Sequence, residues 1–415
     1  MDDLVYWLWI SLSCTADSAT FPKLIEAFGA DAKAVYDATD SELRSILGSR
    51  SSDCTRLCNK DLYKAEELYK FCSTRGVGIL HYGMENYPKS LREIKTPPVL
   101  LYYRGVLPDF DKTVGCAIVG TRRLSEYGRK NAFSIAYDLA KSGATVISGM
   151  AAGIDGVAHA GAIAAGAPTV AVLGSGIDVP YPSEHLTLAR AIVKNGCVLT
   201  EYPPSTKPDR YNFPKRNRII SALSDATLLI EGEERSGSLI TARFAKEQGK
   251  LVFGLPGNVG NSTSMASNLL IKNGAKLCTS AEDIISEIEK IRPAFLNPFL
   301  LEERPFVNMM SVLEELRVSA LCRDDGIFSR IKKRFSSDKS PKYKKETEIL
   351  RENTPIKSLS GKEGALYSKI PENEDCLIES LVDGEMTLRE VMRTLLKLEM
   401  GGHVEMLPGE RVKRT

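Results

Sequence analysis

Residues 114–174 read VGCAIVGTRRLSEYGRKNAFSIAYDLAKSGATVISGMAAGIDGVAHAGAIAAGAPTVAVLG. Short apolar runs rich in Val and Ile, at 114–119, 144–148 and 169–173, alternate with longer segments of helical spacing. Several of the helix-like segments end at a glycine, which suits the left-handed residue that closes many helices. Strand, helix, strand at this spacing predicts βαβ units and a parallel sheet.

The same alternation continues toward the C-terminus. Further apolar runs lie at 197–200, 226–230 and 250–254, and 276–278 is a possible seventh strand. The pattern predicts an α/β fold in which helices cover both faces of a parallel sheet. Ligands of such sheets bind outside the carboxyl ends of the strands, so the loops that leave these strands are the candidate site.

The positions of Pro and Gly and changes in composition divide the chain into four predicted parts. Residues 1–80 have helical periodicity and predict a small helical domain, SAM-like or helix-hairpin-like. Residues 81–290 form the sheet domain. Residues 291–370 include a stretch dense in Lys, Ser and Glu and predict a charged linker. Residues 371–415 regain apolar periodicity and predict a small winged-helix-like C-terminal domain.

Composition excludes several classes of protein. The 415 residues carry 55 Lys and Arg against 53 Asp and Glu, a net charge of +2, so bulk charge does not bring this chain to nucleic acid. No apolar run reaches the ~20 residues of a membrane helix. Nine scattered Cys and four His, without a Cys-x-x-Cys motif, predict reduced thiols, a cytoplasmic location, and neither a metal site nor a cofactor.

Two of the strand-exit loops carry groups suited to phosphate. Arg122 and Arg123 follow the first strand, where guanidinium groups can bind phosphate oxygens in a bidentate manner. The alternative is a pair of ordinary surface arginines. Ser148-Gly149-Met-Ala-Ala-Gly153-Ile-Asp155 follows the second strand, and its small residues would let backbone N–H groups approach an anion at a helix N-terminus.

Asp155 and His159 stand four residues apart in that second segment. A catalytic pair is one interpretation. The interpretation we favour is a structural one, in which the aspartate caps the helix and the histidine packs beneath it.

A third loop combines cations with aromatic residues. Within 211–220, Phe213 lies next to Lys215, Arg216 and Arg218. Cations can follow a phosphate backbone while an aromatic ring stacks on a base. The competing interpretation is internal, with Arg216 or Arg218 bracing loops through carboxylates.

The fourth loop, 231–241, presents Ser236, Gly237 and Ser238 at the start of a helix, with Thr241 one turn further on. Hydroxyls and bare N–H groups there suit a phosphate, although an ordinary serine-capped helix would look the same. Four such loops at one edge of a sheet would form a row of donors. A row suits a polymer of phosphates better than a single nucleotide.

Known catalytic motifs are missing from the sequence. It contains no Gly-x-x-x-x-Gly-Lys-[Ser/Thr] phosphate loop, no Gly-x-Ser-x-Gly elbow and no His-Glu-x-x-His. Gly174-Ser-Gly176 begins like a dinucleotide fingerprint, but Val179 stands at the third glycine position. No nucleophile and base pair stands out, so we expect no catalytic residues and no enzyme activity.

The loops taken together resemble the bacterial DprA/Smf family of DNA-processing proteins. The resemblance spans about 80–280 and rests on motifs in order: Val119-Gly-Thr-Arg-Arg, Ser148-Gly-Met-Ala-Ala-Gly-Ile-Asp, Ala171-Val-Leu-Gly-Ser-Gly with Tyr181-Pro182, Phe213-Pro-Lys-Arg-Asn-Arg-Ile-Ile, Arg235-Ser-Gly-Ser-Leu-Ile-Thr, and Pro256-Gly257 with Gly274-Ala275.

This resemblance implies an extended Rossmann-like domain that binds and protects single-stranded DNA and loads the RecA recombinase during natural transformation. It also implies a homodimer and no enzyme activity. The resemblance implies a phosphate path lined by Arg122, Lys215, Arg216, Arg218 and the 236–238 turn. Gly149 and Gly153 would shape this path, Phe213 or a neighbouring aromatic residue would stack on a base, and Asn217 would hold the loop.

Two alternatives from other classes stay open. One is a phosphoribohydrolase-like enzyme that acts on nucleoside monophosphates, although the acidic turn 231–234 is followed by Ser-Gly-Ser rather than Gly-Gly-x-Gly-Thr. The other is a sensor of a small phosphorylated ligand.

Overall fold

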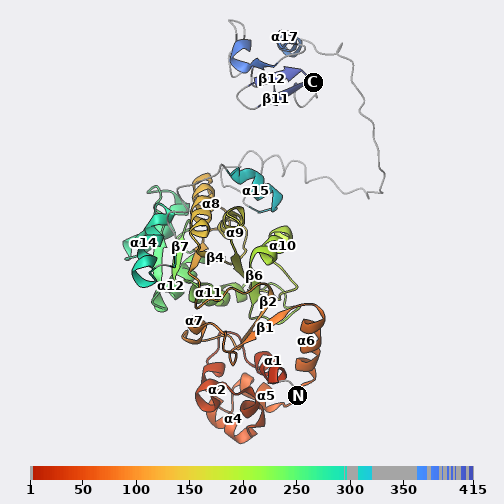
Figure 1. Ribbon diagram of the computed structural model, residues 1–415, viewed down its shortest axis with the longest axis vertical. Coiled ribbons are helices and arrows are strands. Elements are labelled where there is room, and N and C mark those ends of the chain that lie inside the picture. Colours follow the sequence, from red (N-terminus) through yellow and green to blue (C-terminus); the bar gives the residue numbers. More distant parts are fainter. Residues whose placement is uncertain are drawn as a thin grey trace, which may run out of the picture. The chain divides into compact units, whose positions relative to one another are not determined.

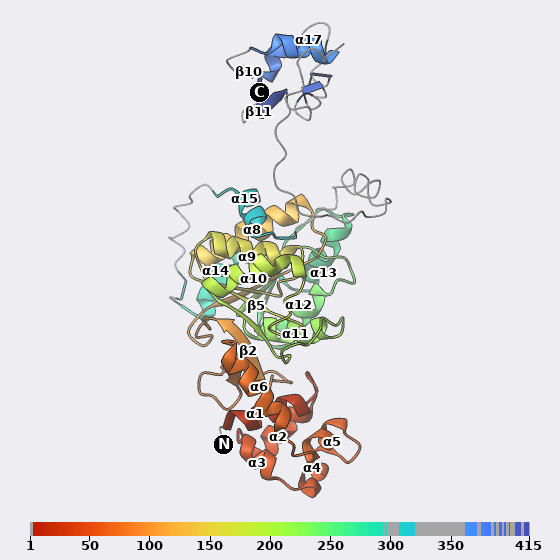
Figure 2. The same cartoon turned by 90° about the vertical axis from the view of Figure 1, so that its right-hand side faces the viewer.

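The computed structural model describes residues 3–293, 295–296, 307–319, 362–371, 375–382, 386, 390–391, 394–395, 398, 403–407 and 411–414. The chain forms two compact units, Met1–Ser337 and Asp338–Thr415. Figures 1 and 2 show the elements of both units in two views.

A nine-stranded sheet organises the first unit, in the order β1-β2-β6-β5-β4-β3-β7-β8-β9. The strands from β3 to β9 pair in parallel, whereas β1 and β2 are antiparallel additions at one edge. The strands are β1 (Gly78–His81), β2 (Leu100–Gly105), β3 (Gly115–Val119), β4 (Thr145–Ser148), β5 (Thr169–Val172), β6 (Cys197–Thr200), β7 (Ala226–Leu229), β8 (Leu251–Gly254) and β9 (Lys276–Leu277). All seven predicted strands are present, which confirms the α/β, extended Rossmann-like fold.

The strand order reverses between β3 and β7. From β3 the chain winds outward through β4, β5 and β6, then crosses back to β7 on the other side and winds outward again through β8 and β9. The loops that leave β3 and β7 therefore diverge to opposite sides of the sheet. Such a reversal is the place where sheets of this class bind ligands.

Helices cover both faces of the sheet (Figures 1 and 2). On one face lie α8 (Glu126–Lys141), α9 (Ile154–Ala164), α10 (Leu186–Asn195) and α14 (Ala281–Ile291). On the other lie α7 (Lys89–Arg92), α11 (Asn212–Ala222), α12 (Ser238–Glu247) and α13 (Met265–Lys272). The short 3-10 helices η1 (Ser183–His185) and η2 (Ser262–Ser264) precede α10 and α13.

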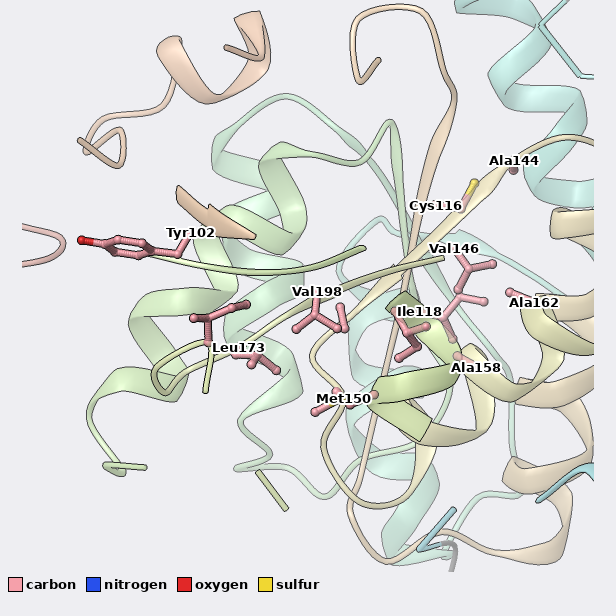
Figure 3. Close-up of a cluster of buried hydrophobic side chains, with 14 of the residues drawn as sticks. Tyr102, Cys116, Ile118, Ala144, Val146, Met150, Ala158, Ala162, Leu173 and Val198 are labelled. Atoms are coloured by element: carbon pink, nitrogen blue, oxygen red, sulfur yellow. The ribbon is translucent and has the colours of Figure 1, made fainter. Parts of the chain in front are cut away.

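The core on the α8–α9 side is built from small and branched residues. Figure 3 shows Ile118 and Val146 of the sheet close to Ala158 and Ala162 of α9. Helices α8 and α9 also pack closely on each other, since a Cβ added at Gly161 would lie 2.6 Å from the Phe133 carbonyl oxygen. The run of Gly and Ala in α9 is therefore a packing requirement.

Six helices precede the sheet: α1 (Asp3–Ser13), α2 (Thr20–Phe28), α3 (Ala32–Asp37), α4 (Asp40–Leu47), α5 (Ser52–Cys58) and α6 (Tyr63–Thr74). They gather around α1, whose Trp7, Leu8 and Ile10 are at most 1% exposed. The apolar stretch at the N-terminus is thus the central helix of this helical part, which packs on β1 and β2 through α6 and α1. No described helix has the length and apolar character that crossing a membrane requires.

The second unit contains α17 (Lys362–Lys369), β10 (Cys376–Leu377), the 3-10 helix η5 (Ile378–Leu381), β11 (Val404–Leu407) and β12 (Arg411–Arg414). Its three strands form an antiparallel sheet in the order β10-β12-β11. The winged-helix-like class of residues 371–415 stays a prediction, and α17 precedes that range. The middle of the predicted charged linker, 320–361, lies outside the described residues. Its described parts include two helices that the prediction lacked, α15 (Met309–Glu315), which packs on α9, and α17 (Lys362–Lys369).

His159 is buried on α9 as a neutral side chain. Its Nδ1 lies 2.8 Å from Thr169 Oγ1, and that hydroxyl donates to the Val146 carbonyl oxygen at 2.7 Å, so Nδ1 is the protonated nitrogen. Asp155 instead accepts the N–H groups of Gly149 and Ala151. These partners support a structural role for both residues, but the predicted helix cap is wrong: the N-cap of α9 is Gly153, and Asp155 holds the preceding turn instead.

The burial of His159 predicts acid sensitivity. Burial, with smaller effects from His185 and Arg216, lowers the pKa of His159 to about 3. In the unfolded chain His159 therefore takes up a proton near pH 6.5, whereas in the folded chain it stays neutral at that pH. As a result, the free energy of unfolding falls as the pH drops below 6.5. We expect a loss of about 1.4 kcal/mol per pH unit from this residue, measured by denaturant titration at pH 7 and pH 5. His159→Gln should reduce the pH slope, and an unchanged slope would contradict the assignment.

Candidate nucleic-acid interface

A cavity of about 740 Å³ lies at the carboxyl ends of β3 and β7, where the strand order reverses. Residues from all four predicted loops line it, together with residues of the segments after β5 and β6. The lining consists of Val119, Gly120, Thr121, Arg122, Arg123, Ala151, Asp155, Tyr181, Pro208, Arg210, Phe213, Pro214, Arg216, Asn217, Ile220, Glu233, Arg235, Ser236, Gly237, Ser238 and Thr241. The structure thus brings most of the predicted site residues together.

Glu231 ties the loop after β7 to the loop after β3. Its buried carboxylate accepts the Ser125 N–H at 2.9 Å and the Ser125 hydroxyl at 2.6 Å. Ser125 in turn caps α8 through the Gly128 N–H, and the Thr121 N–H donates to the Glu231 carbonyl oxygen. The sequence placed Glu231 only in an acidic turn, and nothing local marked it as the link between two loops.

Exposed arginines surround the cavity. Arg122 and Arg123 come from the loop after β3, Arg210 from the segment before α11, and Arg235 from the loop after β7. The sequence-based site omitted Arg210 and Arg235, although Arg235 stands directly before the selected Ser236. Glu233 is the exposed acidic residue of the lining, so the charge around the mouth is predominantly positive.

The turn before α12 offers donors for an anion. Ser236 Oγ and Ser238 Oγ lie 2.7 Å apart, and Asn217 Nδ2 donates to the Gly237 carbonyl oxygen at 3.4 Å. Within the described chain, neither the Gly237 N–H nor the Arg122 N–H has a hydrogen-bond acceptor. These two N–H groups, and the one hydroxyl of the serine pair that does not donate to the other, can therefore bind phosphate oxygens.

Phe213 forms an aromatic wall of the cavity. The Arg122 guanidinium carbon lies 5.4 Å from the centre of its ring, and the ring of Tyr181 lies 5.5 Å away, tilted by 43°. Tyr181 was not selected from the sequence as a site residue. The motif Tyr181-Pro182 in the family resemblance was the one signal that could have found it.

Arg216 lies in the floor of the cavity rather than on its surface. It is 4% exposed, and its guanidinium donates to the carbonyl oxygens of Gly149, at 2.8 Å, and of Val172. Burial lowers the pKa of Arg216 to about 10, while Asp155 opposes that change, so the group stays charged at neutral pH. Arg216 thus has the internal place of the alternative interpretation, although it braces the loops through carbonyl oxygens rather than through carboxylates.

Arg218 and Lys215 lie outside this cavity, which corrects their expected place in its lining. Arg218 is 2% exposed and forms a bidentate pair with Glu201 at 2.7 and 2.8 Å. Lys215 donates to the Ala16 carbonyl oxygen at 3.2 Å and lines a separate cavity of about 360 Å³. Helical periodicity is the reason, because positions 215 and 218 lie on the opposite face of α11 from Phe213 and Asn217.

The glycine-rich turn before α9 also differs from its predicted role. Three of its N–H groups are already bonded, those of Gly149 and Ala151 to Asp155, and that of Gly153 to the Ser319 carbonyl oxygen at 2.8 Å. The N–H groups of these three residues are therefore not available to an anion.

The two glycines of that turn have steric roles instead. A Cβ at Gly149 would lie 2.4 Å from Arg216 Nη2. Gly153 has φ of +86°, and a Cβ there would lie 2.3 Å from the Thr121 carbonyl oxygen.

Comparisons with known proteins agree on one family. Residues 78–289 match the family model described as DNA recombination-mediator protein A. DNA processing protein DprA of Bacillus subtilis (strain 168) is 38% identical over 225 residues, which cover 54% of this chain and 76% of that protein. DNA processing protein DprA of Streptococcus pneumoniae is 41% identical over 203 residues, 49% of this chain and 71% of that protein.

A solved structure agrees with these matches. The X-ray structure of DNA processing protein A from Streptococcus pneumoniae superposes with a TM-score of 0.61 at 32% identity, covering 69% of this chain and 99% of that one. The resemblance inferred from the strand-exit loops is thereby confirmed, and the chain belongs to the DNA recombination-mediator protein A family, the family of the DprA and Smf proteins.

Proposed function

We propose that this chain binds single-stranded DNA, largely without sequence preference, at the cavity where the strand order reverses. The observation that carries the proposal is the ring of exposed arginines, from three separate loops, around an aromatic wall. Arginines and free N–H groups can neutralise a phosphate backbone, and an aromatic ring can stack on a base of any identity. The bases of a duplex are already stacked and paired, so the aromatic wall favours an unpaired strand.

The wider role follows the family. We propose that the bound strand is protected and handed to the RecA recombinase during natural transformation, that the chain acts as a cytoplasmic homodimer, and that it is a binding protein rather than an enzyme. Support comes from membership of a family described as recombination mediators. The electrostatic mechanism needs no covalent step, since holding and releasing a strand requires only contacts that weaken with salt.

A binding titration tests the site. Single-stranded oligonucleotide and its duplex are titrated over a salt series. We expect tighter binding of the single strand, with log affinity falling linearly with log salt at a slope of about −0.7 per neutralised phosphate. Equal affinity for the duplex would contradict the proposal.

Mononucleotide binding and a nucleotide hydrolysis assay separate the alternatives. Saturable binding of a mononucleotide that no oligonucleotide improves would support the sensor of a small phosphorylated ligand. Release of free base from a nucleoside monophosphate would support the hydrolase.

A further inference from the structure

A segment beyond the sheet reaches back to the glycine-rich turn that precedes α9. Residues 307–319, named the strap from here on, contain α15 and lie beyond the range 78–289 that matches the family model. The strap packs on α9 (Figure 1), and its Leu313 and Leu316 are 4% and 7% exposed. None of the described strap residues lines the cavity, so the docked strap leaves the cavity open.

The end of α15 directs the strap toward the turn. Arg317 has φ of +52°, and its N–H donates to the Glu314 carbonyl oxygen at 3.0 Å. The Val318 N–H donates to the Leu313 carbonyl oxygen at 2.8 Å, which completes a Schellman motif and ends the helix. Val318 then lies against α9, since a Cβ added at Gly156 would lie 2.9 Å from its Cγ1 atom.

Ser319 connects the strap to the turn through two backbone hydrogen bonds. Its carbonyl oxygen accepts the Gly153 N–H at 2.8 Å, and its N–H donates to Nε2 of the buried His185 at 2.8 Å. His185 Nδ1 in turn donates to the Met150 carbonyl oxygen at 3.0 Å. Burial lowers the pKa of His185, so the ring is neutral and its Nε2 can accept a hydrogen bond.

The turn held in this way is strained and shapes the cavity. Met150 is buried with φ of +55°, a conformation that residues other than glycine keep only where their surroundings hold them. Ala151 and Asp155 of the turn line the cavity. A Cβ at Gly153 would lie 2.7 Å from Arg122 Cα, so the turn also packs directly on the loop that carries this arginine.

We infer that the strap is a positioning element of the DNA site, whose Ser319 holds the turn, and through it Arg122, in the arrangement that binds the strand. This inference rests on the proposed function and extends it to a segment outside the sheet. Strap docking and DNA binding favour the same arrangement of the turn. Each should therefore strengthen the other by the same factor.

Leu313→Asp tests the effect of docking, and Met310→Asp is its matched control. Both variants add one negative charge to α15, but Leu313 is buried, whereas Met310 is 50% exposed. A carboxylate at position 313 cannot stay buried against α9 without a cation, so the strap should undock. We expect Leu313→Asp to bind oligothymidylate about 5- to 150-fold more weakly than Met310→Asp, the usual range of coupling between two sites. Equal affinity of the two variants would overturn the inference.

A second pair of variants tests the contact itself. Both Ser319 contacts are made by the backbone, so Ser319→Ala keeps them and should bind oligothymidylate as the original chain does. Ser319→Pro removes the N–H that His185 accepts and should bind more weakly. Equal losses in the alanine and proline variants, or no loss in either, would contradict this role of Ser319.

Hydrogen exchange of the full chain gives a readout that a merely structural role would not change. Saturating oligothymidylate should slow exchange of the strap amides by about the factor that Leu313→Asp loses in affinity. Without DNA, the Gly153 N–H should exchange faster in Leu313→Asp than in Met310→Asp, because its acceptor on Ser319 has left.

Two kinds of failure remain distinct. If the original chain binds oligothymidylate and strap exchange does not change, this inference is overturned and the proposed function stands. If the original chain binds no oligonucleotide, the proposed function fails, and the coupling inferred from it fails as well.

Discussion

Replacing Arg218 with methionine should lower the free energy of unfolding of the first unit by about 3–5 kcal/mol. The Glu201 side chain is 5% exposed and receives two hydrogen bonds from this arginine, and Asp17 lies 3.4 Å from the Arg218 Nε atom. Methionine would leave the Glu201 carboxylate in a place that water hardly reaches, without the cation that neutralises it. Chemical denaturation followed by circular dichroism measures the loss.

The double variant Arg218→Met with Glu201→Leu provides the control. Because both charges are removed together, we expect it to recover most of the stability that the single variant loses. If the single and double variants unfold at the same denaturant concentration, the pair is not the source of the effect. Folded Arg218→Met protein should keep the salt slope of DNA binding, since a buried guanidinium neutralises no phosphate.

Replacing both Arg122 and Arg235 with alanine should reduce the affinity for single-stranded oligonucleotide by about a hundredfold at low salt. Hydrogen bonds between charged partners contribute about 1.5–3 kcal/mol each, and water around the exposed guanidinium groups reduces that contribution. If each arginine neutralises one phosphate, the salt slope should also become shallower by about 1.4. Fluorescence anisotropy over a salt series measures both quantities.

Two further variants make this result specific. Arg190 is exposed on α10 but does not line the cavity, so Arg190→Ala should leave affinity and slope unchanged. Lys215→Ala tests whether the strand also reaches the second cavity across α11. A double alanine variant that binds as tightly as the original chain would remove the arginines from the proposed DNA path.

The sheet could be predicted because its signals are local. Runs such as 226–230 consist mostly of apolar residues, as strands buried on both faces do, and this run lies between segments with helical spacing. Parallel connections then bring every strand exit to one edge. For that reason Arg122 and Ser236, more than a hundred positions apart in the sequence, could be expected at one site before any coordinates were known.

Other features depended on partners that no local pattern identifies. The third loop carries Lys215, Arg216 and Arg218 within four positions, and composition cannot tell which of them faces a ligand. Which of them faces a ligand depends on the face of α11 that each residue occupies. It also depends on Glu201 and the Ala16 carbonyl oxygen, which belong to distant segments and bind two of these cations. In the same way, Ser319 takes the Gly153 N–H that a bare helix terminus would have offered to an anion.

The sequence by itself determined the parallel α/β sheet, the loops at its ligand-binding edge and the family. Only the tertiary structure decided which cations stay exposed, which are neutralised inside, and that Tyr181 joins Phe213 at the cavity. The physical reason is the separation along the chain of the residues that carry each signal. Strand and helix signals are carried by neighbouring residues, whereas the burial and pairing of a charge depend on groups that only the folded chain brings within a few ångströms.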